Sequence, residues 1–265
     1  MINTPIIWNI TNKCYYSCSF CCLDANSSPK DLSLEDKLRI VENLDSEDIK
    51  VDVSGGDPLN DAENLEILKK LSRKFGRKKI SIISTDKGLE KINFSELANY
   101  VFEVGFTYDF PTEPSPDRPL GYNQHNLELA KEVSKAGVET IAQSPLIKSN
   151  TDPQIIEQIY LNLNKTGIDR LLLMRFSESG RGILKKGLAL TQKEINRALN
   201  IYRKLENRYI LPKVKITPSV RGELLGKVLT SLNITNQGLL LSNPWVYNLG
   251  GEPKTILCLR KYNKR

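Results

Sequence analysis

Four of the five cysteines of this chain lie within nine residues, the cysteine loop Cys14-Tyr-Tyr-Ser-Cys18-Ser-Phe-Cys21-Cys22. Under reducing conditions, cysteines at such short spacings are metal ligands or redox groups more often than disulfide partners. Closely spaced thiolates also hold iron–sulfur clusters, in which each iron takes a tetrahedral set of soft ligands. Three thiolates on a four-iron cluster would leave one iron open for a small chelating molecule. The loop therefore predicts a metal centre.

The elements that must position this loop alternate between strand and helix patterns. Strands are expected at 6–10, 49–56, 78–85, 101–110, 138–147 and 169–176, and helices within 34–44, 61–75, 94–99, 123–136, 153–166 and 192–208. Six strand–helix units in succession predict an α/β fold with a parallel sheet covered by helices. The sheet is either open and doubly wound or closed into a complete or partial barrel.

In both architectures, functional residues gather at the carboxyl ends of the strands. This rule brings several segments to the same face as the cysteine loop, namely Ser54-Gly-Gly-Asp-Pro58, Ser84-Thr85-Asp86, Tyr108-Asp109, 144–150 and 175–182. The proline-rich segment 108–126 also lies there, and its charged residues are candidates for substrate recognition. They are Asp109, Glu113, Asp117 and Arg118. The basic run at 69–79 is expected at the opposite face.

A different pattern of short β-like pieces begins near residue 209, at 213–217, 228–235 and 239–242. We expect a small extension containing a β-hairpin at 209–265, packed on a main domain at 1–208. The chain has 265 residues, of which 40% are hydrophobic and 26% charged, as in globular proteins. Its net charge of +7 bears on encounter with anionic partners rather than on chemistry.

Structural zinc is one alternative for the thiols. Zinc takes four nitrogen or sulfur ligands. The three cysteines in the spacing Cys-x3-Cys-x2-Cys could be completed by Cys22 or Cys258, and His125 is the only histidine. A zinc site would explain the thiols, but not their position after the first strand of an alternating array.

The spacing Cys14-x3-Cys18-x2-Cys21, with Phe20 before the last cysteine, resembles the signature of the radical S-adenosylmethionine (SAM) superfamily. The segment SGGDP at 54–58 is similar to the GGE motif of that superfamily, with Asp57 in place of the usual glutamate. The resemblance covers about residues 5–182. It implies a partial (β/α)6 TIM-type barrel, bound SAM, and one [4Fe–4S] cluster held by these three cysteines.

The same resemblance assigns further cofactor contacts. The backbone of Gly55, Gly56 and Asp57 would hold the amino group of SAM. Other expected contacts with SAM are made by Phe20, Ser84, Thr85, Asn150 and Arg175. Only two cysteines, Cys22 and Cys258, remain after the first cluster, which is too few for a second all-cysteine [4Fe–4S] site.

The tail sequence SLNITNQGLLLSNPW at 231–245 resembles the hairpin that opens a SPASM or twitch extension, although no cysteine follows it here. We therefore expect a twitch-like extension without an auxiliary cluster. Cys258 is then either a buried apolar residue or a thiol that donates a hydrogen atom to a substrate radical.

The resemblance implies an enzyme that reductively cleaves SAM to a 5′-deoxyadenosyl radical, which takes a hydrogen atom from a substrate C–H bond. The substrate is predicted to be a peptide or protein side chain, on the basis of the tail and of the stretch RFSESGRG at 175–182. A nucleotide or small cofactor precursor is the alternative, because Arg175, Arg181, Lys185 and Lys186 could bind an anionic group. A non-catalytic protein that binds an iron–sulfur cluster or zinc is a third, more remote alternative.

An electron donor such as flavodoxin or ferredoxin is the expected protein partner, beside a peptide or a small anionic substrate. Nucleic acid is not expected, because no RNA-binding motif is visible. The first residues, MINTPIIWNITNK, lack the pattern of a signal peptide, and no apolar run reaches the ~20 residues that a membrane span needs. We expect a cytoplasmic protein.

Overall fold

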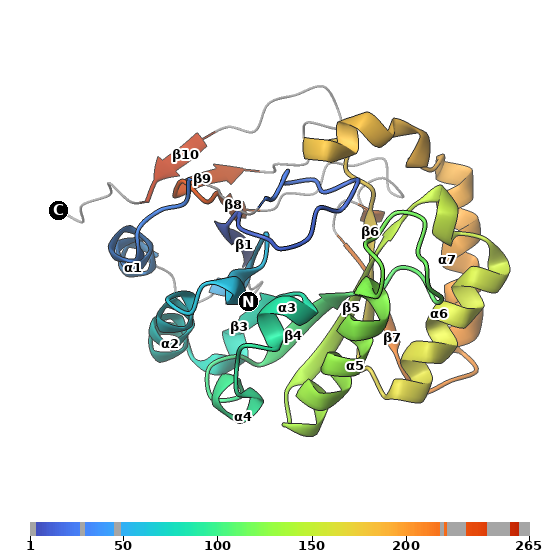
Figure 1. Cartoon of the computed structure of the whole chain (residues 1–265), viewed down its shortest axis with the longest axis horizontal. Coiled ribbons are helices and arrows are strands. Elements are labelled where there is room, and N and C mark those ends of the chain that lie inside the picture. The colour runs from blue at the N-terminus through green and yellow to red at the C-terminus, as the bar shows by residue number, and fades with distance from the viewer. Residues whose placement is uncertain are drawn as a thin grey trace. The chain divides into compact units, whose positions relative to one another are not determined.

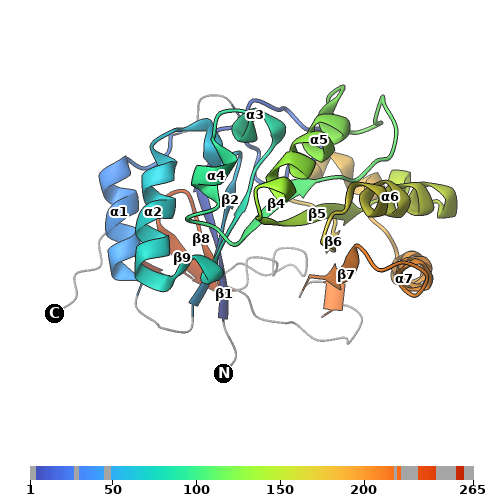
Figure 2. The same cartoon turned by 90° about the horizontal axis from the view of Figure 1, so that it is seen from below.

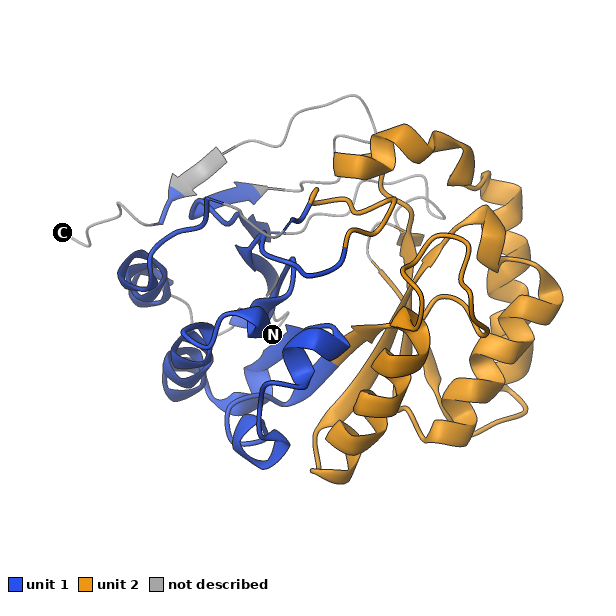
Figure 3. Cartoon of the chain, in the orientation of Figure 1, with its two compact units in different colours: residues 1–16, 25–104, 230–265 blue, residues 17–24, 105–229 orange. Residues whose placement is uncertain are grey.

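The computed structural model of the chain describes residues 4–26, 30–44, 49–217, 220–221, 232–242 and 255–259. The chain forms two compact units (Figure 3): unit 1 comprises residues 1–16, 25–104 and 230–265, and unit 2 comprises residues 17–24 and 105–229. Strand β4 (Glu103–Thr107) leads from the first unit into the second. The predicted division of the chain at 208/209 stays a prediction.

Unit 1 is built on a mixed sheet of parallel and antiparallel strands. Its described strands are β1 (Thr4–Thr11), β2 (Ile49–Gly55), β3 (Ile80–Ile83), β8 (Leu232–Ile234), β9 (Leu239–Ser242) and β10 (Thr255–Cys258), in the order β10-β9-β8-β1-β2-β3. Alternate side chains of β1 (Ile6, Trp8 and Ile10) are buried, while Ile7 and Asn9 are half-buried. This period of two is that of a strand with one face in the core.

The helices expected in unit 1 within 34–44, 61–75 and 94–99 are present, and α3 is a short helix that was not predicted. They are α1 (Leu34–Asn43), α2 (Asn64–Phe75), α3 (Asp86–Leu89) and α4 (Phe94–Leu97), with the short turns η1 (Pro58–Asn60) and η2 (Arg77–Lys79). Helix α1 begins after Ser33, whose side chain accepts a hydrogen bond from the backbone N–H of Asp36. Helix α2 ends at Gly76, whose φ of 84° favours glycine. Figures 1 and 2 show α1 beside α2.

Unit 2 continues the strand–helix alternation. Its elements are β5 (Glu139–Leu146), β6 (Arg170–Arg175), β7 (Lys213–Ile216), α5 (Tyr122–Lys135), α6 (Pro153–Thr166), α7 (Gln192–Glu206), η3 (Lys148–Asn150) and η4 (Gly180–Leu188). Strands β5, β6 and β7 are parallel neighbours in that order. Helices α6 and α7 pack together, as Figure 1 shows, and supply apolar side chains such as Ile159, Leu163 and Leu199 to the core.

Residues near the C-terminus contribute strands to each of the two units. β7, which we expected in the extension, is paired in parallel with β6 from Arg170↔Lys213 to Leu173↔Ile216. The predicted hairpin is present as β8 and β9, and β8 also pairs in parallel with β1. β10 was not predicted and pairs antiparallel with β9. The predicted strand residues 228–231 and the tail stretch 243–245 lie outside the described residues.

The predicted fold class is confirmed: the chain is α/β, with parallel strands and intervening helices in the pattern of a partial (β/α)6 TIM-type barrel, and with a hairpin in its C-terminal extension. Helices of the described ranges are all too short or too polar to cross a membrane.

Candidate functional site

The segment SGGDP packs its backbone directly against the chain that leads into the cysteine loop. The N–H of Gly56 donates to the carbonyl of Thr11 at 2.7 Å, and the N–H of Asp57 donates to the carbonyl of Lys13, also at 2.7 Å. Gly55 has a φ of 140°, and a Cβ on Gly55 or Gly56 would overlap the backbone of Thr11 or Lys13. Both glycines are therefore required by close approach of two backbones.

Asp57 is fully buried and binds the other two polar residues predicted for this part of the site. The hydroxyl of Ser84 donates to Asp57 Oδ1, and the hydroxyl of Thr85 donates to Oδ2 at 2.5 Å. Burial raises the pKa of Asp57, although the hydrogen bonds from Ser84 and Thr85 oppose that shift. The structure thus brings Asp57, Ser84 and Thr85 together, and the two hydroxyls are directed at the carboxylate.

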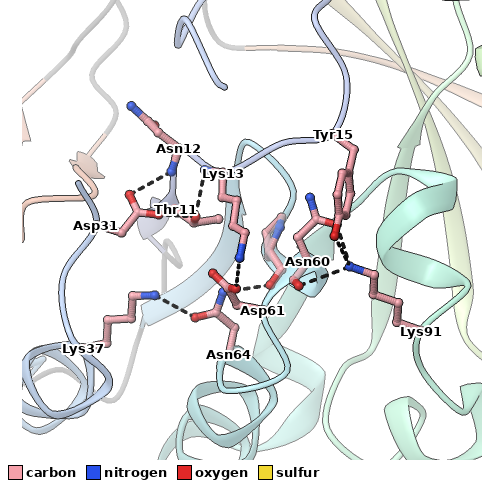
Figure 4. A network of polar contacts seen from close by, with 11 residues as sticks. Thr11, Asn12, Lys13, Tyr15, Asp31, Lys37, Asn60, Asp61, Asn64 and Lys91 are labelled. Atoms are coloured by element: carbon pink, nitrogen blue, oxygen red, sulfur yellow. Dashed lines mark hydrogen bonds and ion pairs between the residues drawn. The ribbon is translucent and has the colours of Figure 1, made fainter. Parts of the chain in front are cut away.

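A polar network surrounds the start of the cysteine loop in unit 1 (Figure 4). Asp31 accepts hydrogen bonds from the hydroxyl of Thr11 and from the N–H of Asn12 at 3.0 Å. It also accepts one from Asn236 Nδ2 at 3.0 Å. Asn236 lies in the turn between β8 and β9, so Asp31 links the C-terminal hairpin to Thr11 and Asn12, which precede Cys14.

Lysines complete this network. Lys13 Nζ lies 2.5 Å from Asp61 Oδ1, and that hydrogen bond raises the pKa of Lys13. Lys37 is buried on α1 and donates to Asn64 Oδ1 at 2.9 Å, and its burial lowers its pKa. Both contacts are visible in Figure 4. The residue next to Cys14 is therefore held by an ion pair rather than by its backbone alone.

The two tyrosines after Cys14 are also bound within unit 1. The hydroxyl of Tyr16 donates to Asp86 Oδ2 at 2.8 Å. Lys91 Nζ lies 4.4 Å from the centre of the Tyr15 ring, as a cation–π contact. The predicted ligand Cys14 belongs to unit 1, whereas Cys18 and Cys21 belong to unit 2.

In unit 2, the cysteine loop is held by residues that follow β6. Arg181 donates from Nε to the carbonyl of Cys18 and from its backbone N–H to the carbonyl of Cys21, both at 2.9 Å. Ser179 Oγ donates to the carbonyl of Cys22 at 3.1 Å. Gly180 has a φ of 53° and lies against the carbonyl of Cys21. We expected Arg181 to serve an anionic substrate, but this side chain already binds the loop.

Phe20 is a core residue of the same unit. Its ring lies edge-on to Phe176 with centroids 5.9 Å apart, and Ile147 belongs to the same apolar cluster. The guanidinium of Arg118 lies 4.3 Å from the centre of the Phe20 ring. Sequence reasoning missed this contact, because Arg118 lies 98 positions further along the chain and in a segment that we read as a substrate-recognition loop.

The remaining predicted residues are placed as follows. Asn150 is buried, and its Nδ2 donates to the carbonyls of Asp109 and Pro145 while its Oδ1 accepts from the N–H of Ile147. Arg175 is half-buried at the end of β6. Cys258 is half-buried on β10. Strands β9 and β8 lie between β10 and β1, so three strand spacings of about 4.8 Å, or about 14 Å in all, separate the strand of Cys258 from β1.

The donor set fits an iron–sulfur cluster. Cys14, Cys18 and Cys21 are not in disulfide bonds, and the first two are buried. Over the described residues, no three His, Cys, Asp or Glu side chains are arranged around a single metal-ion position. Ligands of a cluster bind separate iron atoms rather than one common ion. For Cys22, burial raises the pKa of the thiol to about 12, which disfavours its thiolate.

Comparison with known proteins places this site in a family. The family profile described as "Radical SAM superfamily" matches residues 8–159, more than half of the chain. The match includes the cysteine loop, SGGDP and Ser84-Thr85. None of the curated proteins that were compared matches the sequence.

Several solved structures share the fold. SuiB of Streptococcus suis, crystallised with its precursor peptide SuiA, has a TM-score of 0.72 and 14% identity, and the match covers 97% of this chain and 63% of SuiB. Native anSMEcpe with bound AdoMet has a TM-score of 0.64 and 18% identity, with 98% and 78% of the two chains covered. The same protein with AdoMet and the Cp18Cys peptide gives 0.65 and 20%, with the same coverage. The present chain therefore spans less than two thirds of the length of SuiB.

Proposed function

The chain belongs to the radical SAM superfamily, and from that premise we propose that it is a radical SAM enzyme that modifies a peptide or protein side chain. When bound, the [4Fe–4S] cluster and SAM used by this superfamily supply a 5′-deoxyadenosyl radical that removes a hydrogen atom from a substrate C–H bond. The cysteine loop is the observation that carries the proposal. It combines the Cys-x3-Cys-x2-Cys spacing, with no cysteine in a disulfide bond, and a backbone held by Arg181 and Ser179.

Cys14, Cys18 and Cys21 are the proposed ligands of the cluster. The contacts around them support this choice, because Lys13 is paired with Asp61 and the carbonyls of Cys18 and Cys21 are bound by Arg181. Bound loop ends reduce the conformational entropy that is lost when a cluster is assembled. This arrangement would fix the ligands without using their side chains.

The backbone of Gly55, Gly56 and Asp57 is the proposed contact for the amino group of SAM. The N–H groups of Gly56 and Asp57 already donate to Thr11 and Lys13. An amino group is itself a donor, so it needs acceptors, which the carbonyl oxygens of this segment supply. Ser84, Thr85, Phe20, Asn150 and Arg175 stay proposed contacts, and Cys258 stays a proposed hydrogen donor.

A peptide substrate is supported by the fold matches, because SuiB was crystallised with a precursor peptide and anSMEcpe with the Cp18Cys peptide. A nucleotide or small anionic cofactor precursor is the second candidate, and the exposed side chains of Lys185 and Lys186 after β6 favour it. The segment 108–126 is less available for recognition than we expected. Two of its charges, Asp109 and Arg118, form a buried ion pair with each other.

The cluster is the first test. The chain is reconstituted anaerobically with iron and sulfide, and we expect about four irons per chain and formation of 5′-deoxyadenosine only when a reductant is added. Cys18→Ser should lose both, while Cys258→Ser, which leaves the proposed ligands in place, should keep the iron. Bound zinc, or a cluster that never cleaves SAM, would overturn the proposal.

The substrate is the second test. A set of synthetic peptides and a set of nucleotides, both deuterated at carbon, are incubated with the reduced enzyme and SAM. Deuterium in 5′-deoxyadenosine together with a mass change in a peptide supports the peptide substrate. Transfer from nucleotides alone would replace it with the second candidate.

We further propose that a small electron-carrier protein such as flavodoxin or ferredoxin reduces the cluster, and that the reaction takes place in the cytoplasm. None of the five cysteines, all of which are described, is in a disulfide bond, as expected of a reducing compartment. Replacement of the chemical reductant by a reduced flavodoxin should sustain 5′-deoxyadenosine formation. No turnover with flavodoxin or ferredoxin would count against this partner.

A further inference from the structure

Arg118 is a buried charge for which the proposed reaction has no role so far. The side chain of Arg118 is 9% exposed and that of Asp109 is 3% exposed. Arg118 donates from Nε and Nη2 to Asp109 Oδ2 at 2.9 and 2.6 Å. A guanidinium stays protonated in proteins, so this charge is permanent. Burying such a pair removes two ions from water, and the mutual attraction offsets that cost only in part.

The pair lies directly against the cysteine loop within unit 2. The guanidinium carbon of Arg118 lies 4.3 Å from the centre of the Phe20 ring and 5.1 Å from that of Tyr122. Ser19 donates from Oγ to the carbonyl of Asp117 at 3.3 Å. Ser19 and Phe20 of the loop are thus in contact with Asp117 and Arg118 of the segment 108–126. Both loop residues lie between Cys18 and Cys21 in the sequence.

The fixed cation contacts Phe20, which lies between the proposed ligands Cys18 and Cys21 in the sequence. Reduction of an iron–sulfur cluster adds one electron, and a nearby positive charge stabilises the reduced form. The interaction is strong where water is excluded, since Coulomb energies rise as the effective dielectric constant falls. Burial lowers the pKa of Arg118, but the interactions with Asp109 and other neighbouring groups together outweigh this effect and raise that pKa, so the guanidinium keeps its charge.

We propose that Arg118 tunes the reduction potential of the cluster. Its positive charge lies on the ring of Phe20, the residue before Cys21, and raises the reduction potential. The negative charge of Asp109 limits that rise. Arg118 is in this sense a positioning and tuning residue that does not touch the reacting atoms. The inference rests on the proposed function, because it requires a cluster at these cysteines.

A redox titration of the reconstituted full-length enzyme, followed by electron paramagnetic resonance, tests the inference. In Arg118→Met we expect the ratio of reduced to oxidised cluster, at the midpoint of the wild-type enzyme, to fall at least threefold, a shift of about 28 mV for one electron. In Asp109→Asn the ratio should rise, because the cation loses its counter-charge. Opposite shifts from the two halves of one ion pair are a signature that loss of packing does not produce.

Two further variants separate charge from structure. Arg118→Lys keeps the charge and should keep the potential close to that of the wild-type enzyme. Arg170→Met is the matched control: Arg170 also pairs with a carboxylate, Glu139, at 2.5 Å, but at the opposite ends of β5 and β6 from the loop. It should leave the potential unchanged.

The inference is overturned if Arg118→Met and Asp109→Asn both keep the wild-type potential, if both shift it in the same direction, or if Arg118→Lys shifts it as far as Arg118→Met. Should Arg118→Met fail to fold, Asp109→Asn and Arg118→Lys still decide the question. A wild-type chain that holds no cluster would instead overturn the proposed function, and its iron content distinguishes this failure from the others.

Discussion

Gly56 lies so close to the carbonyl oxygen of Lys13 that a methyl group on its α-carbon would overlap that oxygen. The contact is between two backbones, so neither partner can turn a side chain away. Because Cys14 follows Lys13, any movement that relieves an overlap at Gly56 also moves the start of the cysteine loop.

We therefore expect Gly56→Ala to lower the free energy of unfolding by about 1–3 kcal/mol, as overpacking does, and to weaken iron retention. Gly187→Ala is the control, since a Cβ there has no neighbour within 4 Å. Urea unfolding and iron content of both variants measure the difference. Equal stability of the two variants would show that the backbones separate at little cost.

Asp57 predicts a dependence of stability on pH. Its pKa in the folded chain is raised above the ordinary value of 3.8 by burial, so the folded state holds this proton more tightly than the unfolded state does. Its contribution to stability is therefore fully present below about pH 3.8 and is lost as the pH rises through the folded pKa.

The free energy of unfolding of the wild-type chain minus that of Asp57→Asn should accordingly fall as the pH is raised above 3.8, because asparagine does not ionise. Urea unfolding of the cluster-free chain at several pH values measures this difference. A difference that stays constant, or that grows with pH, would contradict the assignment.

Cys21 and Cys22 should respond differently to loss of their thiols. Cys21→Ser should lose most of the cluster iron, while Cys22→Ser should keep about four irons per chain. The reason is that a thiol with a pKa of about 12 is a poor source of thiolate. Iron analysis and the visible absorption of the reconstituted variants decide the matter. The reverse result would identify Cys22, rather than Cys21, as the third ligand of the cluster.

Asn236 should couple the C-terminal hairpin to the cysteine loop through Asp31. Asn236→Ala removes one hydrogen bond and should cost about 1 kcal/mol, with faster amide hydrogen exchange at 11–14. Asn236→Asp should cost more, because it places a second carboxylate beside Asp31.

Gln124→Ala is a matched control for this change, since Gln124 also donates from an amide to a carboxylate, that of Glu128, but on the exposed surface of α5. It should change neither stability nor exchange at 11–14. If amide hydrogen exchange at 11–14 is as slow in Asn236→Ala as in the wild-type chain, the hairpin does not restrain the loop.

The sequence predicted the main strands and helices because their patterns are local. Residues 6–10 form an apolar run of strand length, and the Thr151-Asp152-Pro153 signal starts α6 where expected, with Asp152 accepting from the N–H of Gln154. The short apolar run of β7 also has a strand pattern, but nothing local says that its partner is β6. The sequence therefore did not predict the pairing of β7 with β6.

Sequence analysis identified the motifs of the candidate site but not the distant residues that hold the cysteine loop in place. The spacing of the cysteines and the SGGDP segment are visible in a short window of sequence. By contrast, Arg181 binds Cys18 across 163 positions and Asn236 binds Asp31 across 205. A single sequence carries no pattern that links positions so far apart, and an arginine that binds a carbonyl has the same local sequence as one that binds a substrate.

Arg181 and Ser179 bind the cysteine loop through the main-chain carbonyls of Cys18, Cys21 and Cys22. Every amino acid has such a carbonyl, so these contacts do not depend on the side chains between the ligands. Ser17 is exposed within the loop. A fluorescent or spin-labelled amino acid introduced at Ser17 would therefore leave these anchoring bonds intact, and its signal would follow metal loading from inside the loop itself.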